Sequence, residues 1–289
     1  MGSGKGEDGG KRLTGGEQQS TTYSRLSKWK MPATIGSDLG SWKLNTLKPD
    51  EHLKSRIEKL GDEAGRFFYN LENDLYRLRI QWRIYNALFG TNHERVTLLN
   101  QCSGITAHYF EKSMFESAML SICRMTDSPE AKKISDKNIT VRRLPGYLTG
   151  APDLELCKRL DEAIARTAFA RSQRNKRLAH ADDDVRNGRA TVDSANLPMM
   201  KDATNAIAGC IRRFATIELE VSLDTHPISH YSGDEVYFLN ILSLGLKKNE
   251  EIAEIARGYR NDKNWNALKL LKESPSWLTF RPADEHDAE

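Results

Sequence analysis

The sequence has little excess charge of either sign. Across its 289 residues, 43 Lys and Arg face 40 Asp and Glu, which leaves a net charge of +3. A net charge this small does not indicate nucleic-acid binding by the chain as a whole, so such a function has to depend on a local basic patch. Charged residues still make up 29% of the chain, as expected for long solvated helices.

Long apolar runs are also missing. No stretch approaches the roughly 18 consecutive apolar residues that a membrane-spanning helix needs. The N-terminus carries no basic segment followed by an apolar one, so it does not look like a secretory signal. We therefore expect a protein that has no membrane contact, is not secreted and is cytoplasmic.

Cysteine is scarce and widely spaced. The four cysteines form no C-x-x-C pair and have no paired histidine ligands; they are Cys102, Cys123, Cys157 and Cys210. The first three lie within apolar helical patterns, which predicts buried free thiols rather than disulfides or a zinc site. Free thiols fit a reducing compartment. The sequence has none of the common phosphate-loop, dinucleotide, zinc-protease or serine-hydrolase motifs, and we expect no metal and no cofactor.

Alternation with a period of two is missing as well, so no sheet is predicted. Apolar residues instead recur every three or four positions in segments that begin near residues 51, 94, 153 and 197. A further helical pattern spans 236–246, and short helices are expected around Ile252 and Leu268. The predicted fold class is all-α: an up-and-down helical bundle of four to five main helices with extra C-terminal helices.

The same patterns predict the organisation of the chain and its interior. Residues 1–45 are rich in Gly, Ser, Thr, Lys and Gln and predict a disordered, basic N-terminal tail. Residues 50–225 form the main helical domain and 230–289 a C-terminal helical appendage. The pattern in the first segment, 51–89, predicts one helix that Gly61 and Gly65 can bend. Residues expected to point inward from the second helix are Val96, Leu99, Cys102, Ile105, Tyr109, Phe110, Phe115, Leu120, Ile122 and Met125.

Several polar side chains beside these stripes have ordinary structural interpretations. We expect His108 to be a buried or half-buried packing residue and His93 to start a helix. The acidic residues next to the first stripe are expected on a solvated face; they are Glu58, Glu63, Glu72 and Asp74.

One segment combines concentrated positive charge with a titratable base. It comprises Arg171, Arg174, Asn175, Lys176, Arg177 and His180, at the end of the third helical pattern. An imidazole can take a proton from a ribose hydroxyl or give one to a leaving oxygen. Guanidinium groups can grip a phosphate and stabilise its developing charge. This set of groups is suited to RNA cleavage without a metal, because RNA carries its own nucleophile. The structural alternative is a solvated helix end whose cations complement the helix dipole.

Helical geometry limits how this segment can form a site. Arg174 and His180 are six positions apart, which on an α-helix puts them about 120° apart in rotation and roughly 9 Å apart along the axis. Either the helix ends between them, or another copy of the chain supplies half of the site. A symmetric dimer would bring two histidines and several arginines around one groove.

The segment from Arg174 to His180 resembles the R-x(4–6)-H motif of the HEPN superfamily, including a polar residue after the arginine. Further segments, which follow in the same order along the chain, are similar to the abortive-infection, AbiU-like branch; they lie at 98–101, 107–110, 115–127 and 138–144. The resemblance covers roughly residues 60–220. One departure is Asp182, because HEPN toxins partnered by nucleotidyltransferase antitoxins often have a tyrosine at that position.

The resemblance implies a helical bundle that forms a homodimer with a composite active site. It implies a metal-independent endoribonuclease, in phage defence or a toxin–antitoxin system, that cleaves RNA by attack of the ribose 2′-hydroxyl. Arg174 and His180 would be catalytic, with Asn175 assisting. We expect the remaining cations to bind RNA phosphates; they are Arg171, Lys176 and Arg177. An antitoxin or defence protein is a further expected partner. The alternative is a non-catalytic HEPN module that binds RNA, a nucleotide or a protein.

Overall fold

The structure of the protein is a computed structural model that describes residues 49–130, 137–178, 183–189, 191–226 and 233–271. The expected N-terminal tail, residues 1–45, lies outside these ranges, and so does His180. The described residues are helical, apart from connecting segments and one isolated antiparallel bridge between Glu130 and Lys137. The all-α prediction is therefore confirmed.

The first predicted helix is divided in two. Helix α1 (Pro49–Leu60) and helix α2 (Asp62–Tyr85) meet at Gly61, whose φ of 82° lies in the left-handed region that glycine adopts readily. Helix α2 continues into a π turn, η2 (Asn86–Gly90). A side chain at Gly65 would lie 2.6 Å from the Cα of Ile57, so glycine here allows α1 and α2 to pack closely.

Helix α3 (His93–Thr126) begins where the sequence predicts. The side chain of Asn92 caps it by accepting a hydrogen bond from the Glu94 backbone at 2.7 Å. The helix is interrupted at Ser103, which has φ −169° and ψ 100°. Near this break the predicted inward face is wrong. Ile105 and Tyr109 are 77% and 63% exposed, and Cys102 and Phe110 are also exposed; in the second half of the helix, Leu120 is exposed as well. His108 is exposed rather than buried.

The reason is a shortage of neighbouring elements. The first half of α3 buries only Leu99 and Ala107, and these pack in a small separate cluster with Leu88 of η2 and Leu239 of α8. The second half joins the main core, where Ile122 and Met125 are fully buried as predicted. An apolar stripe predicts which residues can be covered, but not whether an element is present to cover them.

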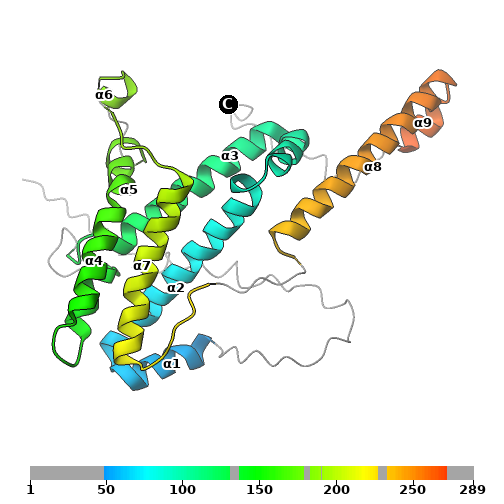
Figure 1. The fold of residues 1–289 in the computed structure, drawn as a ribbon. Helices are drawn as coiled ribbons and strands as arrows, with labels where there is room; N and C mark the ends of the chain where they lie inside the picture. The colour runs from blue at the N-terminus through cyan, green and yellow to red at the C-terminus, as the bar shows by residue number, and fades with distance from the viewer. Residues whose placement is uncertain (1–48, 131–136, 179–182, 190, 227–232, 272–289) are drawn as a thin grey trace, which may run out of the picture. The chain divides into compact units, whose positions relative to one another are not determined.

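The bundle is completed by α4 (Leu154–Arg166), α5 (Ala168–Gln173) and α7 (Leu197–Glu218), joined by the 3-10 helix η3 (Val141–Tyr147) and the short α6 (Asp183–Arg186). Helices α2, α3 and α7 lie against one another, and α4 packs along α7 (Figure 1). Their shared core includes Phe68 and Phe214, whose ring centroids are 5.0 Å apart. The bundle prediction is confirmed.

The C-terminal helices differ in length from the prediction. Helix α8 (Glu235–Asn261) is one long helix that includes Ile252, so no separate short helix forms there. Helix α9 (Trp265–Leu271) contains Leu268 as expected. Helix α8 contacts α3 and η2, and Arg83 of α2 forms an ion pair with Glu235 at 3.1 Å. The proposed division into domains at residues 50–225 and 230–289 stays a prediction.

Two groups of side chains are placed differently from the prediction. All four cysteines are free as predicted, but Cys102 and Cys157 are exposed while Cys123 and Cys210 are buried. Cys157 follows the buried Leu156 by one position, which on a helix turns it to the outer face.

Glu72 is the second departure, because it is fully buried rather than solvated. Its two carboxylate oxygens accept hydrogen bonds of 2.9 and 2.8 Å from the guanidinium of Arg56, which is itself 8% exposed. A carboxylate beside an apolar stripe can thus be internal when a neighbouring helix supplies a matching cation.

Candidate functional site

The basic motif begins where the third helix loses its regular α geometry. Asp153 caps α4 by accepting a hydrogen bond from the Leu156 backbone at 2.6 Å, as the sequence predicts. The helix is interrupted at Thr167, whose hydroxyl donates to the Ala163 carbonyl at 2.8 Å. After α5, residues Arg174–Leu178 form a π turn, η4. Such turns occur frequently at functional sites because they displace side chains from the α-helical register.

Arg174 is held by two groups that fix its guanidinium. Its NH1 donates to the Asp127 carboxylate at 2.5 Å, and its Nε donates to the side-chain oxygen of Asn175 at 3.1 Å. The side chains of Arg174 and Asp127 are 27% and 28% exposed. The remaining terminal nitrogen, NH2, makes no hydrogen bond to any described residue. Arg174 is therefore both oriented and able to receive a further anionic partner.

Arg171 is placed one turn earlier and is used mainly within the fold. Its NH1 donates to the hydroxyls of Thr126 at 3.1 Å and Thr167 at 2.8 Å, and its NH2 donates to the carbonyl of Ile164. Burial lowers its pKa, with a smaller contribution from the nearby Arg142. Its phosphate-binding role stays a prediction, and a phosphate there would compete with these three partners.

Lys176 and Arg177 have weaker attachments. Lys176 Nζ donates to the Thr191 carbonyl at 3.2 Å, which holds the segment after α6 against the π turn. Arg177 lies 3.7 Å from Glu116 and remains 54% exposed. Both cations are accessible enough to contact a ligand, and their predicted phosphate contacts are not tested by the geometry.

Arg177 also lines a pocket of about 450 Å³ between α2, α3 and the start of α7. We call this the motif pocket; its other walls include Tyr85, His108, Glu111, Lys112, Phe115, Glu116 and Asn196. Burial raises the pKa of Tyr85 to about 12, so its phenol stays protonated at neutral pH and can donate a hydrogen bond. The pocket combines aromatic surface with groups of both charges, which suits a polar ligand with flat rings.

His180 lies outside the described residues, as do its neighbours at 179–182. The structure therefore brings together Arg174, Asn175 and Arg177 around the π turn, but it does not show where the predicted base lies. Because residues 174–178 do not follow α-helical geometry, the 100° per residue used for the helical-face argument does not apply to this interval. The composite dimeric site stays a prediction.

Three residues of this region were not recognised from the sequence. Neither Asp127 nor Glu116 is predicted from the sequence to belong to the site. His108 was assigned to the interior, whereas it faces the motif pocket. Nothing in the local sequence marks Asp127 as the partner of Arg174, and only the contact across 47 positions identifies it.

Two further observations bear on the kind of site this is. Among the described residues, no three His, Cys, Asp or Glu side chains gather in a way that could hold a metal ion. In the same part of the chain, no helix is both long enough and apolar enough to cross a membrane.

The fold and the motif together define a class: an all-α bundle domain with a basic, histidine-containing motif after a helix break. Comparison with known families gives a more specific assignment. The family model described as HEPN AbiU2 matches residues 61–238, which is more than half of the chain. The chain therefore belongs to the AbiU2 family of HEPN domains, a family related to abortive infection. Searches of curated proteins and of solved structures found no significant match.

Proposed function

We propose that this chain is a metal-independent endoribonuclease of the HEPN type, acting in phage defence or as a toxin with an antitoxin. The observation that carries the proposal is the state of Arg174. Asp127 and Asn175 fix two of its nitrogens, while its third makes no hydrogen bond to the described residues. An oriented guanidinium with spare donors is what stabilisation of a phosphorane charge requires.

In the proposed reaction, His180 removes the proton from the ribose 2′-hydroxyl, whose oxygen then attacks the adjacent phosphorus. The bond from phosphorus to the 5′-oxygen breaks, and that oxygen takes up a proton. The products are a 2′,3′-cyclic phosphate and a free 5′-hydroxyl. Arg174 stabilises the charge on the phosphorus oxygens, Asn175 positions Arg174, and Arg177 binds a neighbouring phosphate from the rim of the motif pocket.

The experiment that tests this is incubation of end-labelled RNA with the protein in EDTA, followed by analysis of the new ends. We expect cleavage that leaves a cyclic phosphate. Salt-sensitive binding without any product would instead support the alternative of a non-catalytic module.

The alternative has one specific observation in its favour. Large apolar side chains are exposed on α3 and on α8; they are Ile105, Tyr109, Phe110, Val236, Tyr237, Phe238, Ile241 and Leu244. Clusters of exposed apolar side chains often mark surfaces that bind another protein. Such a surface is compatible with an antitoxin, a defence partner or a second copy, and the cleavage assay separates binding alone from catalysis.

The predicted composite dimer has its own test. Arg174→Ala and His180→Ala are expected to be inactive separately. If each site takes arginine from one subunit and histidine from the other, mixing the two variants restores roughly a quarter of the parent activity, since half of the dimers are mixed and each has one complete site. If both groups come from the same subunit, mixing restores nothing.

A further inference from the structure

A second pocket lies away from the motif. It has a volume of about 520 Å³ and is formed by the C-terminal half of α2, the N-terminal half of α7 and the segment after α7. Its walls include Arg79, Trp82, Arg83, Lys201, Asn205 and His226. None of these residues belongs to the basic motif or to the motif pocket. A volume of this size falls within the range of pockets that hold small molecules.

Arg79 provides the first sign of an anion site. Its terminal nitrogens form no ion pair with a described carboxylate; they lie 3.2 Å from the Asn205 side-chain oxygen and 3.3 Å from the His226 ring. Its Nε is buried and has no hydrogen-bond partner among the described residues. Burial lowers the pKa of Arg79 and the proximity of Arg212 lowers it further, while the charge of Asp224 acts in the opposite direction. A half-buried guanidinium without a bonded carboxylate is costly unless a ligand compensates it.

The other charged side chains at the pocket add to this excess of positive charge. Arg83 is paired with Glu235, but its NH1 is buried without a hydrogen-bond partner. Lys201 is exposed and has no ion pair with a described residue. Asp224 lies 3.4 Å from His226 and its charge also acts on Arg79, but it does not line the pocket. Three permanent cations therefore line the pocket, and no described acidic side chain does.

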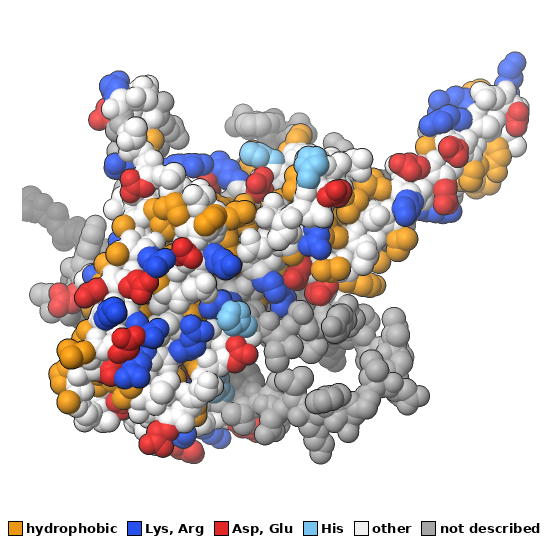
Figure 2. All heavy atoms as spheres, viewed as in Figure 1, with side chains coloured by type: hydrophobic (Ala, Val, Ile, Leu, Met, Phe, Trp, Pro, Cys, Tyr) orange, Lys and Arg blue, Asp and Glu red, His pale blue; other side chains and the backbone are white. Residues whose placement is uncertain are grey.

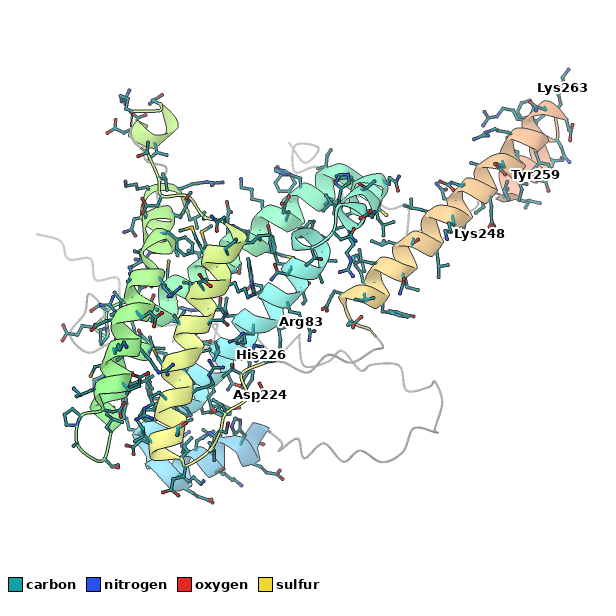
Figure 3. The ribbon with its side chains drawn as sticks, in the orientation of Figure 1. Arg83, Asp224, His226, Lys248, Tyr259 and Lys263 are labelled. Atoms are coloured by element: carbon teal, nitrogen blue, oxygen red, sulfur yellow. The ribbon has the colours of Figure 1, made fainter. Side chains whose placement is uncertain are left out.

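The figures show how these groups are arranged. Figure 3 shows Arg83 on α2 with His226 and Asp224 on the segment that follows α7. In Figure 2, a histidine and several Lys and Arg side chains lie on the face over α2 and α7, with acidic side chains beside some of them. Trp82 is 8% exposed and contributes an apolar wall beside the cations.

We propose that this pocket binds a small phosphorylated molecule through its phosphate. The guanidinium of Arg79 and the ammonium of Lys201 would bind the phosphate oxygens, and Arg83 would add positive charge at the pocket wall. The indole of Trp82 offers a surface for the rest of the molecule. The site does not depend on the ribonuclease proposal, because it shares no residue with the motif.

Binding can be measured by isothermal titration of the full chain with AMP, ribose 5-phosphate, inorganic phosphate and uncharged adenosine. We expect the phosphorylated compounds to bind and adenosine not to bind, and the tightest of the three identifies the source of the phosphate. Arg79→Gln and Lys201→Gln should each weaken binding about tenfold or more, the loss of one charge-assisted hydrogen bond. Arg77→Gln is the matched control, since Arg77 lies on the same helix and is exposed outside the pocket.

Four results would overturn the proposal: no binding of any phosphorylated compound, equal binding of adenosine, equal loss of binding in the Arg77 and Arg79 variants, or binding of an RNA oligonucleotide alone. His180→Ala should bind the phosphorylated compounds like the parent chain, so failure of the ribonuclease proposal leaves this test unaffected. Circular dichroism of each variant checks that the helices are intact.

Discussion

The guanidinium of Arg174 and the carboxylate of Asp127 form an ion pair at 2.5 Å, across 47 positions of sequence. Asp127 stands directly after the last residue of α3, and Arg174 stands directly after the last residue of α5. The pair therefore connects the ends of two helices at the place where the motif begins. Since the pair is only partly exposed, solvent weakens it less than a fully exposed surface pair.

Asp127→Asn tests what this pair contributes to the proposed chemistry. Asparagine has nearly the same shape but no charge, so Arg174 is held less firmly and its position varies more. We expect RNA cleavage about tenfold slower with RNA binding little changed, because misplacement of a charge stabiliser affects the transition state most. Single-turnover cleavage rates and a separate binding assay measure the two effects.

The matched control is Asp161→Asn, because Asp161 is an exposed carboxylate on α4 that forms no hydrogen bond or ion pair with a described residue of the motif. Equal cleavage rates in the Asp127 and Asp161 variants would mean that the ion pair does not position Arg174 for catalysis.

Much of the fold was predictable because helical periodicity is a local signal. The starts of α3 and α4 lie within one residue of the predicted positions 94 and 153, and Asn92 and Asp153 cap these helices through their side chains. The interruptions at Ser103 and Thr167 were not predictable, since serine and threonine are common in continuous helices. The buried state of Glu72 depends on Arg56, a residue on a different helix, and no local pattern reveals such a pairing.

Less of the candidate site than of the fold was predictable from the sequence. The concentration of cations identified the segment around Arg174, but the π turn at Arg174–Leu178 and the role of Asp127 depend on tertiary contacts. The exposure of His108 follows from the break at Ser103 and the few elements that cover the first half of α3. These contacts form only when distant segments of the chain meet.

The Arg56–Glu72 pair allows a stability prediction. Glu72→Leu leaves the nearly buried Arg56 guanidinium without its carboxylate, and we expect a loss of about 3–5 kcal/mol in the free energy of unfolding. The double variant Arg56→Met with Glu72→Leu removes both charges and should recover most of that loss. Urea unfolding followed by circular dichroism measures all three proteins. A double variant as unstable as the single one would contradict this account of the pair.

Thiol reactivity tests the placement of the cysteines. Cys102 and Cys157 are exposed, whereas burial raises the pKa of Cys123 to about 11 and that of Cys210 to about 12. Because the thiolate is the reactive form, the buried pair should resist an aromatic disulfide reagent at pH 8. We expect two of the four thiols to react in the folded protein and all four in denaturant. Rapid reaction of all four without denaturant would contradict the burial of Cys123 and Cys210.

The central claim is that the basic motif cleaves RNA with His180 as the proton-transfer group. The most direct measurement compares the metal-free cleavage rate of the parent chain with that of His180→Ala, using His93→Ala as the control because His93 is an exposed residue at the start of α3. The account predicts that His180→Ala loses cleavage while keeping the helical circular-dichroism signal, and that His93→Ala cleaves like the parent. Cleavage by His180→Ala at the parent rate would contradict the claim.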